Sequence, residues 1–233
     1  MANFRHEIKL LLSYPDYLAL KPKLSALLPT DPNAGPSGEY FIRSLYFDDV
    51  NKTSYFEKLA GVADRKKYRV RIYNQSDETI KLECKEKRGD RIRKRSTGIS
   101  RECAEKMSLG DFSLLDLYDD PLCREVSALA HGKLLRPSVV VDYDREAFLH
   151  PVSNVRLTFD KALHAGIESP DIFDEHLTTV PVFADGSIIF EVKYDEVLPK
   201  FIQGVIAGAR GSKLALSKFT LCRDRLAAFK PKY

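Results

Sequence analysis

The sequence lacks several features that mark particular classes of protein. It has only 4 cysteines, none in a C-x-x-C pair and none with histidines at the spacing of zinc ligands, so free cytosolic thiols are expected. No run approaches the ~18 apolar residues of a membrane span. Residues 1–12 are charged and lack a signal-peptide cleavage site. We therefore expect a cytoplasmic protein with no membrane segment in the chain.

The chain also lacks internal repeats and low-complexity linkers, which favours a single domain over residues 1–233. Its 44% hydrophobic content and 13 phenylalanines are enough for a core, so disorder is not expected. The net charge is only +4. Lys and Arg are nevertheless concentrated between Lys81 and Arg95, which indicates either an anionic partner or a solvated hairpin.

Short segments with alternating side-chain character dominate the sequence and predict β-strands. Turn residues separate them, which favours an antiparallel sheet or barrel. The predicted strands are Phe4–Leu12, Tyr40–Phe47, Lys67–Tyr73, Thr79–Lys87, Arg91–Ser100, Ser138–Phe148, Asn154–Phe159, Ser187–Tyr194 and a last short one, Ala215–Leu221.

Helices are predicted between these strands. Ser13 is a candidate N-cap for a helix over Pro15–Leu28. A second helix is expected before Gly61, and a short one within Leu198–Gly208. The segment Glu102–Gly132 predicts two helices with a break near Pro121.

Several predicted strands place charged side chains on one face. Arg69 and Arg71 share a face of their strand, opposite Val70, because successive side chains alternate. The same spacing groups Glu7 with Lys9, Lys81 with Glu83, Lys85 and Lys87, Tyr143 with Arg145, and Glu191 with Lys193. An ordinary sheet would turn such faces to water. If helices covered the apolar faces from outside, the charged faces would line a closed barrel.

A charged lumen would be costly without a ligand, because like charges repel and lose hydration. A polyanion with divalent metal ions would offset that cost. Lys and Arg would bind phosphate oxygens, with Arg in bidentate fashion. The interleaved carboxylates would hold Mg²⁺ or Mn²⁺, which prefer oxygen ligands.

Seven segments resemble the vacuolar transporter chaperone (VTC) domain, in its bacterial stand-alone form, within the triphosphate tunnel metalloenzyme (CYTH-like) superfamily. They are RHEIK, RSLYFD, YRVRIY, LECKEK, YDREAF, FEVKY and LSKF, which follow the family's order along nearly the whole chain. The resemblance implies an α+β fold: a closed eight-stranded antiparallel β-barrel with helices packed outside. It also implies a metal-dependent polyphosphate polymerase that transfers the terminal phosphate of ATP to a growing chain inside a basic tunnel.

The resemblance further implies roles for individual residues. Those that would grip phosphate during catalysis are Lys9, Arg69, Arg71, Lys85 and Arg145. Those that would contact substrate elsewhere are Lys94, Tyr143, Lys193, Ser217 and Lys218. Glu191 would be the principal ligand of Mn²⁺ or Mg²⁺, together with Glu7.

Two positions depart from the superfamily's patterns. Its hydrolases and cyclases open with E-x-E-x-K, whereas Arg5 occupies the first place here and leaves only Glu7 and Lys9. This favours the VTC branch over a hydrolase or a cyclase. The VTC branch often has another lysine three places before the final one; here that position is Ala215, and Lys213 is a candidate substitute.

Simpler interpretations stand beside these. Arg69, Arg71 and Lys85 could form a surface ladder of ion pairs, Glu191 a salt bridge, and Tyr143 a core position. Two other functions remain open: a triphosphate or polyphosphate hydrolase, and a non-catalytic polyphosphate or nucleotide sensor. The expected partners are ATP or another nucleoside triphosphate and inorganic polyphosphate. Nucleic acid is not expected, because no recognised motif accompanies the basic run.

Overall fold

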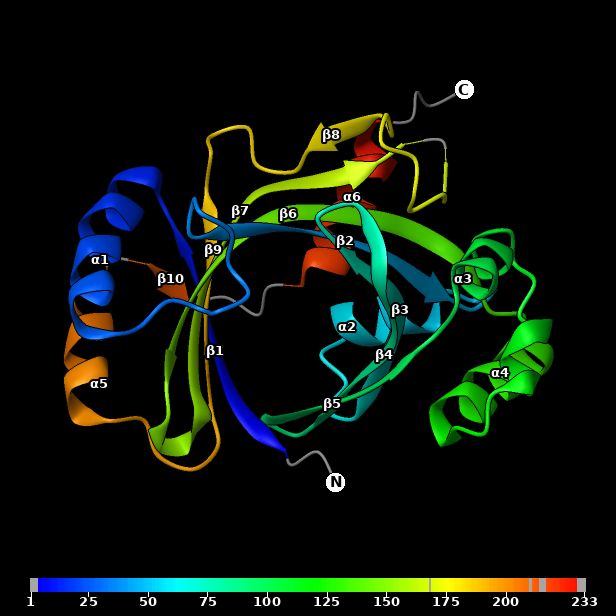
Figure 1. The fold of residues 1–233 in the computed structure, drawn as a ribbon, viewed down its shortest axis with the longest axis horizontal. Helices are drawn as coiled ribbons and strands as arrows, with labels where there is room; N and C mark the ends of the chain where they lie inside the picture. The colour runs from blue at the N-terminus through cyan, green and yellow to red at the C-terminus, as the bar shows by residue number, and fades with distance from the viewer. Residues whose placement is uncertain (1–3, 168, 210, 214–216, 230–233) are drawn as a thin grey trace.

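The computed structural model describes residues 4–167, 169–209, 211–213 and 217–229. Figure 1 shows the arrangement of the helices and strands that these residues form. The elements are β1 (Arg5–Leu12), α1 (Tyr14–Leu27), β2 (Glu39–Asp48), α2 (Thr53–Leu59), β3 (Arg65–Tyr73), β4 (Ser76–Arg88), β5 (Arg91–Gly98), α3 (Arg101–Ser108), the 3-10 helix η1 (Ser113–Leu117), α4 (Pro121–Lys133), β6 (Arg136–His150), the 3-10 helix η2 (Val152–Asn154), β7 (Val155–Gly166), β8 (Thr179–Pro181), β9 (Ile188–Tyr194), α5 (Lys200–Ala207), β10 (Ser212–Lys213) and α6 (Lys218–Phe229).

Eight strands form a closed antiparallel ring in the order β1, β5, β4, β3, β2, β6, β7 and β9, and β9 pairs back on β1. The two strand pairings that β1 makes to close the ring differ in length. β1 pairs with β9 from His6 to Leu12 but meets β5 only at Arg5 and His6. Strand β8 adds to β7, and β10 adds to β1 at Leu10 and Leu11. The predicted eight-stranded antiparallel barrel is confirmed.

Helices cover two sides of the barrel, as Figure 1 shows. α1 and α5 pack on the outer faces of β1, β7 and β9, in an apolar cluster that includes Phe190 and Ile202. α3, η1 and α4 cover the outer faces of β2, β3 and β4 around Leu82 and Met107. Since side chains alternate along a strand, burying these apolar faces outside turns the charged faces inward. Among the described helices, none has the length and apolar character needed to cross a membrane.

Helix starts follow the predicted local signals. The Ser13 hydroxyl accepts a hydrogen bond from the Asp16 N–H at 3.2 Å, as expected of an N-cap. Pro121 is the first residue of α4, and the Asp120 carboxylate caps it by accepting the Leu122 N–H at 2.7 Å. The predicted break near Pro121 is therefore a helix start, although η1 adds a further turn that the sequence did not indicate.

Two predicted strands differ in extent or type from the structure, and the short strands β8 and β10 were not predicted. β7 continues seven residues past Phe159 to Gly166, beyond a register shift opposite β6 where Ala162 has φ +47°. This bulge interrupts the alternation on which the prediction depended. The strand predicted over Ala215–Leu221 is wrong from Lys218 onward, where α6 begins. The Ser217 hydroxyl accepts the Thr220 N–H at 3.4 Å, which is a helix-start contact; Ala215 itself lies outside the described residues.

Apolar side chains fill one part of the lumen. Phe219 and Cys222 of α6 pack against inner-face residues of the barrel, among them Tyr46, Val141 and Ile189. Figure 1 shows α6, in red, passing behind β6 and β7. The rest of the lumen is left to the charged rows, so the barrel has an apolar part and an ionic part.

Candidate functional site

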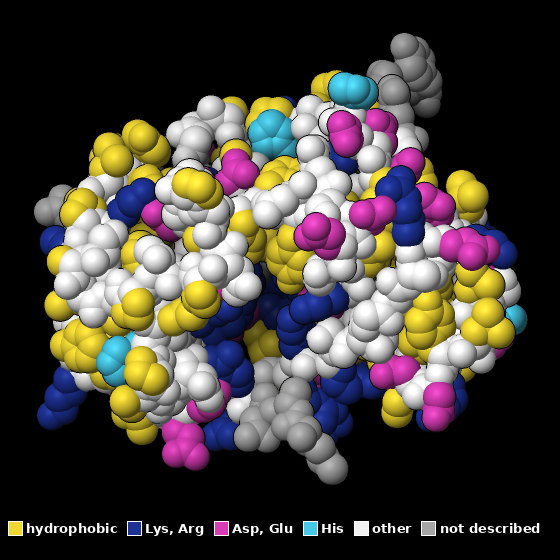
Figure 2. Space-filling model, viewed as in Figure 1, with side chains coloured by type: hydrophobic (Ala, Val, Ile, Leu, Met, Phe, Trp, Pro, Cys, Tyr) yellow, Lys and Arg dark blue, Asp and Glu magenta, His cyan; other side chains and the backbone are white. Residues whose placement is uncertain are grey.

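The barrel contains a cavity of about 700 Å³ with strongly cationic walls. Fourteen Lys and Arg side chains line it, against three Asp and Glu. Figure 2 shows Lys and Arg side chains in dark blue inside the central hollow. The structure brings to this one cavity all twelve residues selected from the sequence: Glu7, Lys9, Arg69, Arg71, Lys85, Lys94, Tyr143, Arg145, Glu191, Lys193, Ser217 and Lys218.

Glu83 of β4 holds the two central arginines of β3. Arg69 Nη2 lies 2.6 Å and Arg71 Nη1 3.7 Å from Glu83 Oε2, and Lys94 Nζ of β5 lies 2.7 Å from Oε1. Burial alone would raise the pKa of Glu83, but Arg71 and Arg69 keep it well below its usual range. The guanidinium groups are therefore fixed by Glu83, which the strand pattern placed on the charged face without indicating its arginine partners.

On the opposite wall, Asp160 of β7 likewise holds an arginine in place. Arg145 of β6 donates to it in a bidentate pair, with Nε–Oδ1 at 2.6 Å and Nη2–Oδ2 at 2.7 Å. Lys218, at the start of α6, also contacts Asp160 and lies 4.9 Å above the Tyr143 ring. The Tyr143 hydroxyl accepts a hydrogen bond from Arg71 Nη2 at 3.1 Å. Tyr143 thus packs with the core and faces the ionic lumen as well.

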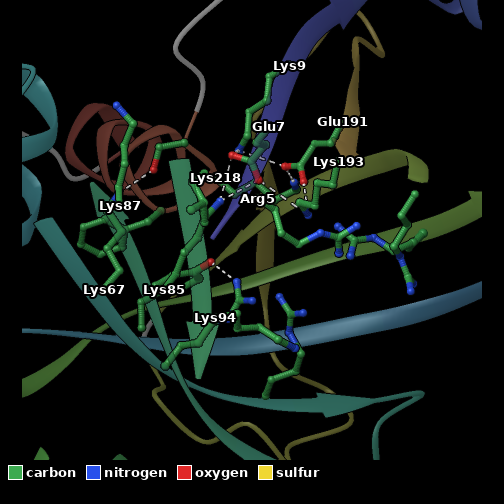
Figure 3. Close-up of a pocket in the computed structure, with 18 of the residues that line it drawn as sticks. Arg5, Glu7, Lys9, Lys67, Lys85, Lys87, Lys94, Glu191, Lys193 and Lys218 are labelled. Carbon is green, nitrogen blue, oxygen red and sulfur yellow. Dashed lines mark hydrogen bonds and ion pairs between the residues drawn. The ribbon is translucent and has the colours of Figure 1, made fainter. Parts of the chain in front are cut away.

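Glu7 of β1 and Glu191 of β9 lie near each other among lysines, as Figure 3 shows. Lys9 Nζ is 3.5 Å from Glu7 and 3.0 Å from Glu191, and Lys193 Nζ is 3.7 Å and 2.8 Å from the same two groups. Lys85 Nζ lies 2.9 Å from Glu7. Burial opposes ionisation, but Lys85 and Lys9 lower the pKa of Glu7 to about 2. Burial acts likewise on Glu191, whose pKa Lys193 keeps well below its usual range.

This carboxylate pair fits a divalent ion that is also held by phosphate. Mg²⁺ in phosphoryl-transfer sites commonly takes one or two carboxylates and completes its shell with phosphate oxygens and water. No group of three or more His, Cys, Asp or Glu side chains suitable for a metal occurs in the part of the chain that the structure describes. Glu7 and Glu191 are ionised, and their lysine partners could turn to phosphate oxygens if a metal took the carboxylates.

Four further cations at the cavity wall were not selected from the sequence as site residues. Lys58 of α2, Arg65 and Lys67 of β3, and Lys87 of β4 line it, and we call them the rim cluster. Lys67 Nζ donates to the Ser217 hydroxyl at 2.7 Å and lies 4.7 Å from the centre of the Phe219 ring. The alternation that grouped Arg69 with Arg71 also places Lys67 and Arg65 on that face, and the same spacing grouped Lys87 with Lys85, so the signal was present for these three and absent only for Lys58.

Comparison with known proteins agrees with this architecture. A family model described as the VTC domain matches residues 4–227. Among solved structures, the chain is similar to a candidate adenylyl cyclase from Hippeastrum with a dominant triphosphatase activity, with a TM-score of 0.60 and 16% identity, covering 95% of this chain and 96% of that one. It is also similar to a candidate adenylate cyclase from Bacillus halodurans, with a TM-score of 0.55 and 11% identity, covering 91% and 93%.

At these identities the solved structures establish a shared fold and nothing finer. No curated protein matches the chain. The family model, by contrast, spans all of the strands that build the barrel and every residue of the ionic cavity. The chain belongs to the VTC domain family.

Proposed function

We propose that this protein is a metal-dependent polyphosphate polymerase that transfers the terminal phosphate of ATP to the end of a polyphosphate chain. The observation that carries the proposal is that the charged faces of the strands point into the barrel, where fourteen Lys and Arg side chains line one cavity. Membership of the VTC family supports a polyphosphate-related activity. Similarity in fold to a protein with triphosphatase activity supports a triphosphate ligand.

The arginines would grip the triphosphate. Arg69, Arg71 and Arg145 present planar guanidinium groups that suit phosphate oxygens. Glu83 and Asp160 hold them in place before a substrate arrives. Donors fixed in this way can stabilise the charge of the transition state without having to reorganise during the reaction.

Glu7 and Glu191 would hold Mn²⁺ or Mg²⁺, which when bound supplies charge neutralisation to the phosphate oxygens. Lys9, Lys85 and Lys193, which lie on these carboxylates, would then contact phosphate. In the transfer, the terminal oxygen of the acceptor chain forms a bond to the γ-phosphorus of ATP, and the bond from that phosphorus to the ADP oxygen breaks. Positioning and electrostatics provide the acceleration, so no protein nucleophile is needed.

Hydrolysis of triphosphate or polyphosphate is the second candidate. The similarity to the Hippeastrum protein favours it, because that protein has a dominant triphosphatase activity. Hydrolysis would use the same cationic grip but would require a positioned water in place of the acceptor chain.

The products formed from ATP and Mn²⁺ distinguish these reactions. Long phosphate chains on a gel would support the polymerase. Release of orthophosphate alone would support the hydrolase. Tight, metal-dependent binding of ATP or polyphosphate without turnover would contradict both and indicate a sensor.

The substitution Arg69→Ala tests the site itself. We expect turnover to fall about 100-fold, because one preorganised electrostatic donor is removed. Thermal melting should show a folded protein, since Glu83 keeps Arg71 and Lys94 as partners. The matched control is Arg93→Ala, which removes an arginine that pairs with Glu86 at 2.5 Å on the outer side of β5. Full activity in Arg69→Ala would contradict the assigned site.

A further inference from the structure

The rim cluster differs in its bonding from the other cations of the cavity. We propose that Lys58, Arg65, Lys67 and Lys87 form a separate anion subsite, which binds the part of a polyphosphate chain that extends beyond the triphosphate. The subsite would make the protein prefer long-chain polyphosphate to short chains. This inference rests on the proposed function to the extent that polyphosphate must enter the same cavity.

Ion pairing divides the cavity cations into two sets. Ten of the fourteen lie within 4.0 Å of a carboxylate: Arg5, Lys9, Arg69, Arg71, Lys85, Lys94, Arg145, Arg156, Lys193 and Lys218. The remaining four are the rim cluster, which forms no such pair with any described residue. Arg65 donates instead to the Val62 carbonyl, and Lys67 to the Ser217 hydroxyl. These side chains have no described carboxylate to release before they can contact an incoming anion.

The rim cluster continues the row that begins with the arginines. Across β3 and β4, Arg69 faces Glu83, Lys67 faces Lys85, and Arg65 faces Lys87. Every second residue points to the same side, so the row from Arg71 to Arg65 extends about 20 Å at the rise of a β-strand. A chain held by the arginines can therefore reach the rim cluster without leaving the lumen wall.

The rim cluster lies at the edge of the cavity. Arg65 and Lys87 also line a second hollow of about 560 Å³, next to α2 and α4. That hollow is lined by six Asp and Glu and by five Lys and Arg, so it lacks the excess of cations that the barrel cavity offers to an anion. Figure 3 shows Lys67 and Lys87 on the side of the cavity away from Glu7 and Glu191. The subsite is thus distinct from the carboxylates that would hold metal.

The electrostatics agree with an anion subsite. Burial lowers the pKa of Lys67 to about 6, and Lys85, Lys9, Arg65 and Lys58 contribute to that decrease. Burial and Arg65 likewise lower the pKa of Lys58. Besides burial, only other cations among the described residues act on the pKa values of Lys67 and Lys58, so these two lysines lack a counter-charge that successive phosphates of one chain would supply.

The test compares two ligands on one variant. Calorimetric titration should measure the affinity of tripolyphosphate and of long-chain polyphosphate for the wild type and for the double variant Lys67→Met, Lys87→Met. We expect the double variant to lose about tenfold in affinity for the long chain and about twofold or less for tripolyphosphate. The control is Lys66→Met, because Lys66 points to the outer side of β3 and pairs with Glu125 at 2.7 Å.

Equal losses for the two ligands would overturn the inference, because the rim cluster would then belong to the triphosphate site. Unchanged affinity for both would also overturn it. If the double variant has a lower melting temperature than the wild type, the affinities for the two ligands are compared in the single variants Lys67→Met and Lys87→Met instead. A wild type that binds long chains through the rim cluster but fails to turn over ATP would support the subsite and reject the polymerase, so the two failures are distinguishable.

Discussion

Two regions of the same cavity differ in whether their lysines and arginines are paired with carboxylates. Around Glu83, Asp160, Glu7 and Glu191, buried carboxylates fix the lysines and arginines in ion pairs. In the rim cluster no described carboxylate does so. The first arrangement would keep the proposed phosphate site ordered before a ligand arrives, because each cation already has a partner. The second retains repulsion that a ligand can relieve, which makes it sensitive to chain length and to pH.

The largest effect should follow from altering Glu191, one of the two carboxylates proposed to hold the metal. Glu191→Gln removes the charge that balances Lys9, Lys193 and Lys218. We expect turnover to fall about 100-fold and half-maximal activity to require more Mn²⁺, as measured by metal titration of the reaction. Glu196→Gln, at an exposed position nearby, is the control. An unchanged metal requirement in Glu191→Gln would remove Glu191 from the metal site.

Asp160→Asn should show that the region in which carboxylates pair with the cavity cations depends on those carboxylates for stability. Arg145 and Lys218 would remain buried without their counter-charge. We expect the free energy of unfolding to fall by about 3 kcal/mol in urea denaturation, the cost typical of breaking a buried pair from one side. Asp185→Asn, at an exposed turn, should change it by less than about 0.5 kcal/mol. Equal effects at the two positions would mean that the buried pair contributes nothing.

The rim cluster should take up a proton when polyphosphate binds. Lys67 faces Lys58 of α2, Arg65 of β3, Lys85 of β4 and Lys9 of β1, and burial with these cations lowers its pKa to about 6. Bound phosphates would raise that pKa, so the bound state holds more protons than the free state at pH 8. Affinity for the long chain should therefore decrease as pH rises above about 6, up to the pKa of the bound state.

Calorimetry in buffers of different ionisation enthalpy measures this proton uptake. Polyphosphate titrates as well, so the informative quantity is the difference between the wild type and Lys67→Met at pH 8. We expect the variant to take up fewer protons. Identical uptake in the two proteins would show that Lys67 is already charged in the free state.

The smallest expected effect is a gain in stability. Lys67→Met removes a partly buried cation that has no carboxylate partner among the described residues, but keeps an unbranched apolar chain against Phe219. We expect the free energy of unfolding to rise by about 1 kcal/mol, measured without ligand at pH 6 in low salt. A loss of stability would mean that the contact with the Ser217 hydroxyl outweighs the repulsion.

The alternation in each strand was sufficient to predict which side chains share a face. It grouped Arg69 with Arg71 and Glu191 with Lys193, and the structure places each pair in the cavity. It did not assign partners, so the structural roles of Glu83 and Asp160 were missed although both alternate with apolar residues. Those partners depend on which strands lie side by side. Lys58 was missed for a similar reason, because α2 reaches the cavity only after folding.

The sequence by itself determined the central part of each barrel strand, the helix N-cap at Ser13 and the separation of charged from apolar faces, because these follow from spacing along a few residues. The tertiary structure alone decided that the charged faces point inward. That outcome requires β1 to pair with β9 and β5, which are distant in the chain, and α1, α3, α4 and α5 to bury the outer apolar faces. It also placed Lys218 of α6 beside Asp160 and left the rim cluster without a carboxylate partner among the described residues. Ring closure is a long-range event, and no local pattern encodes it.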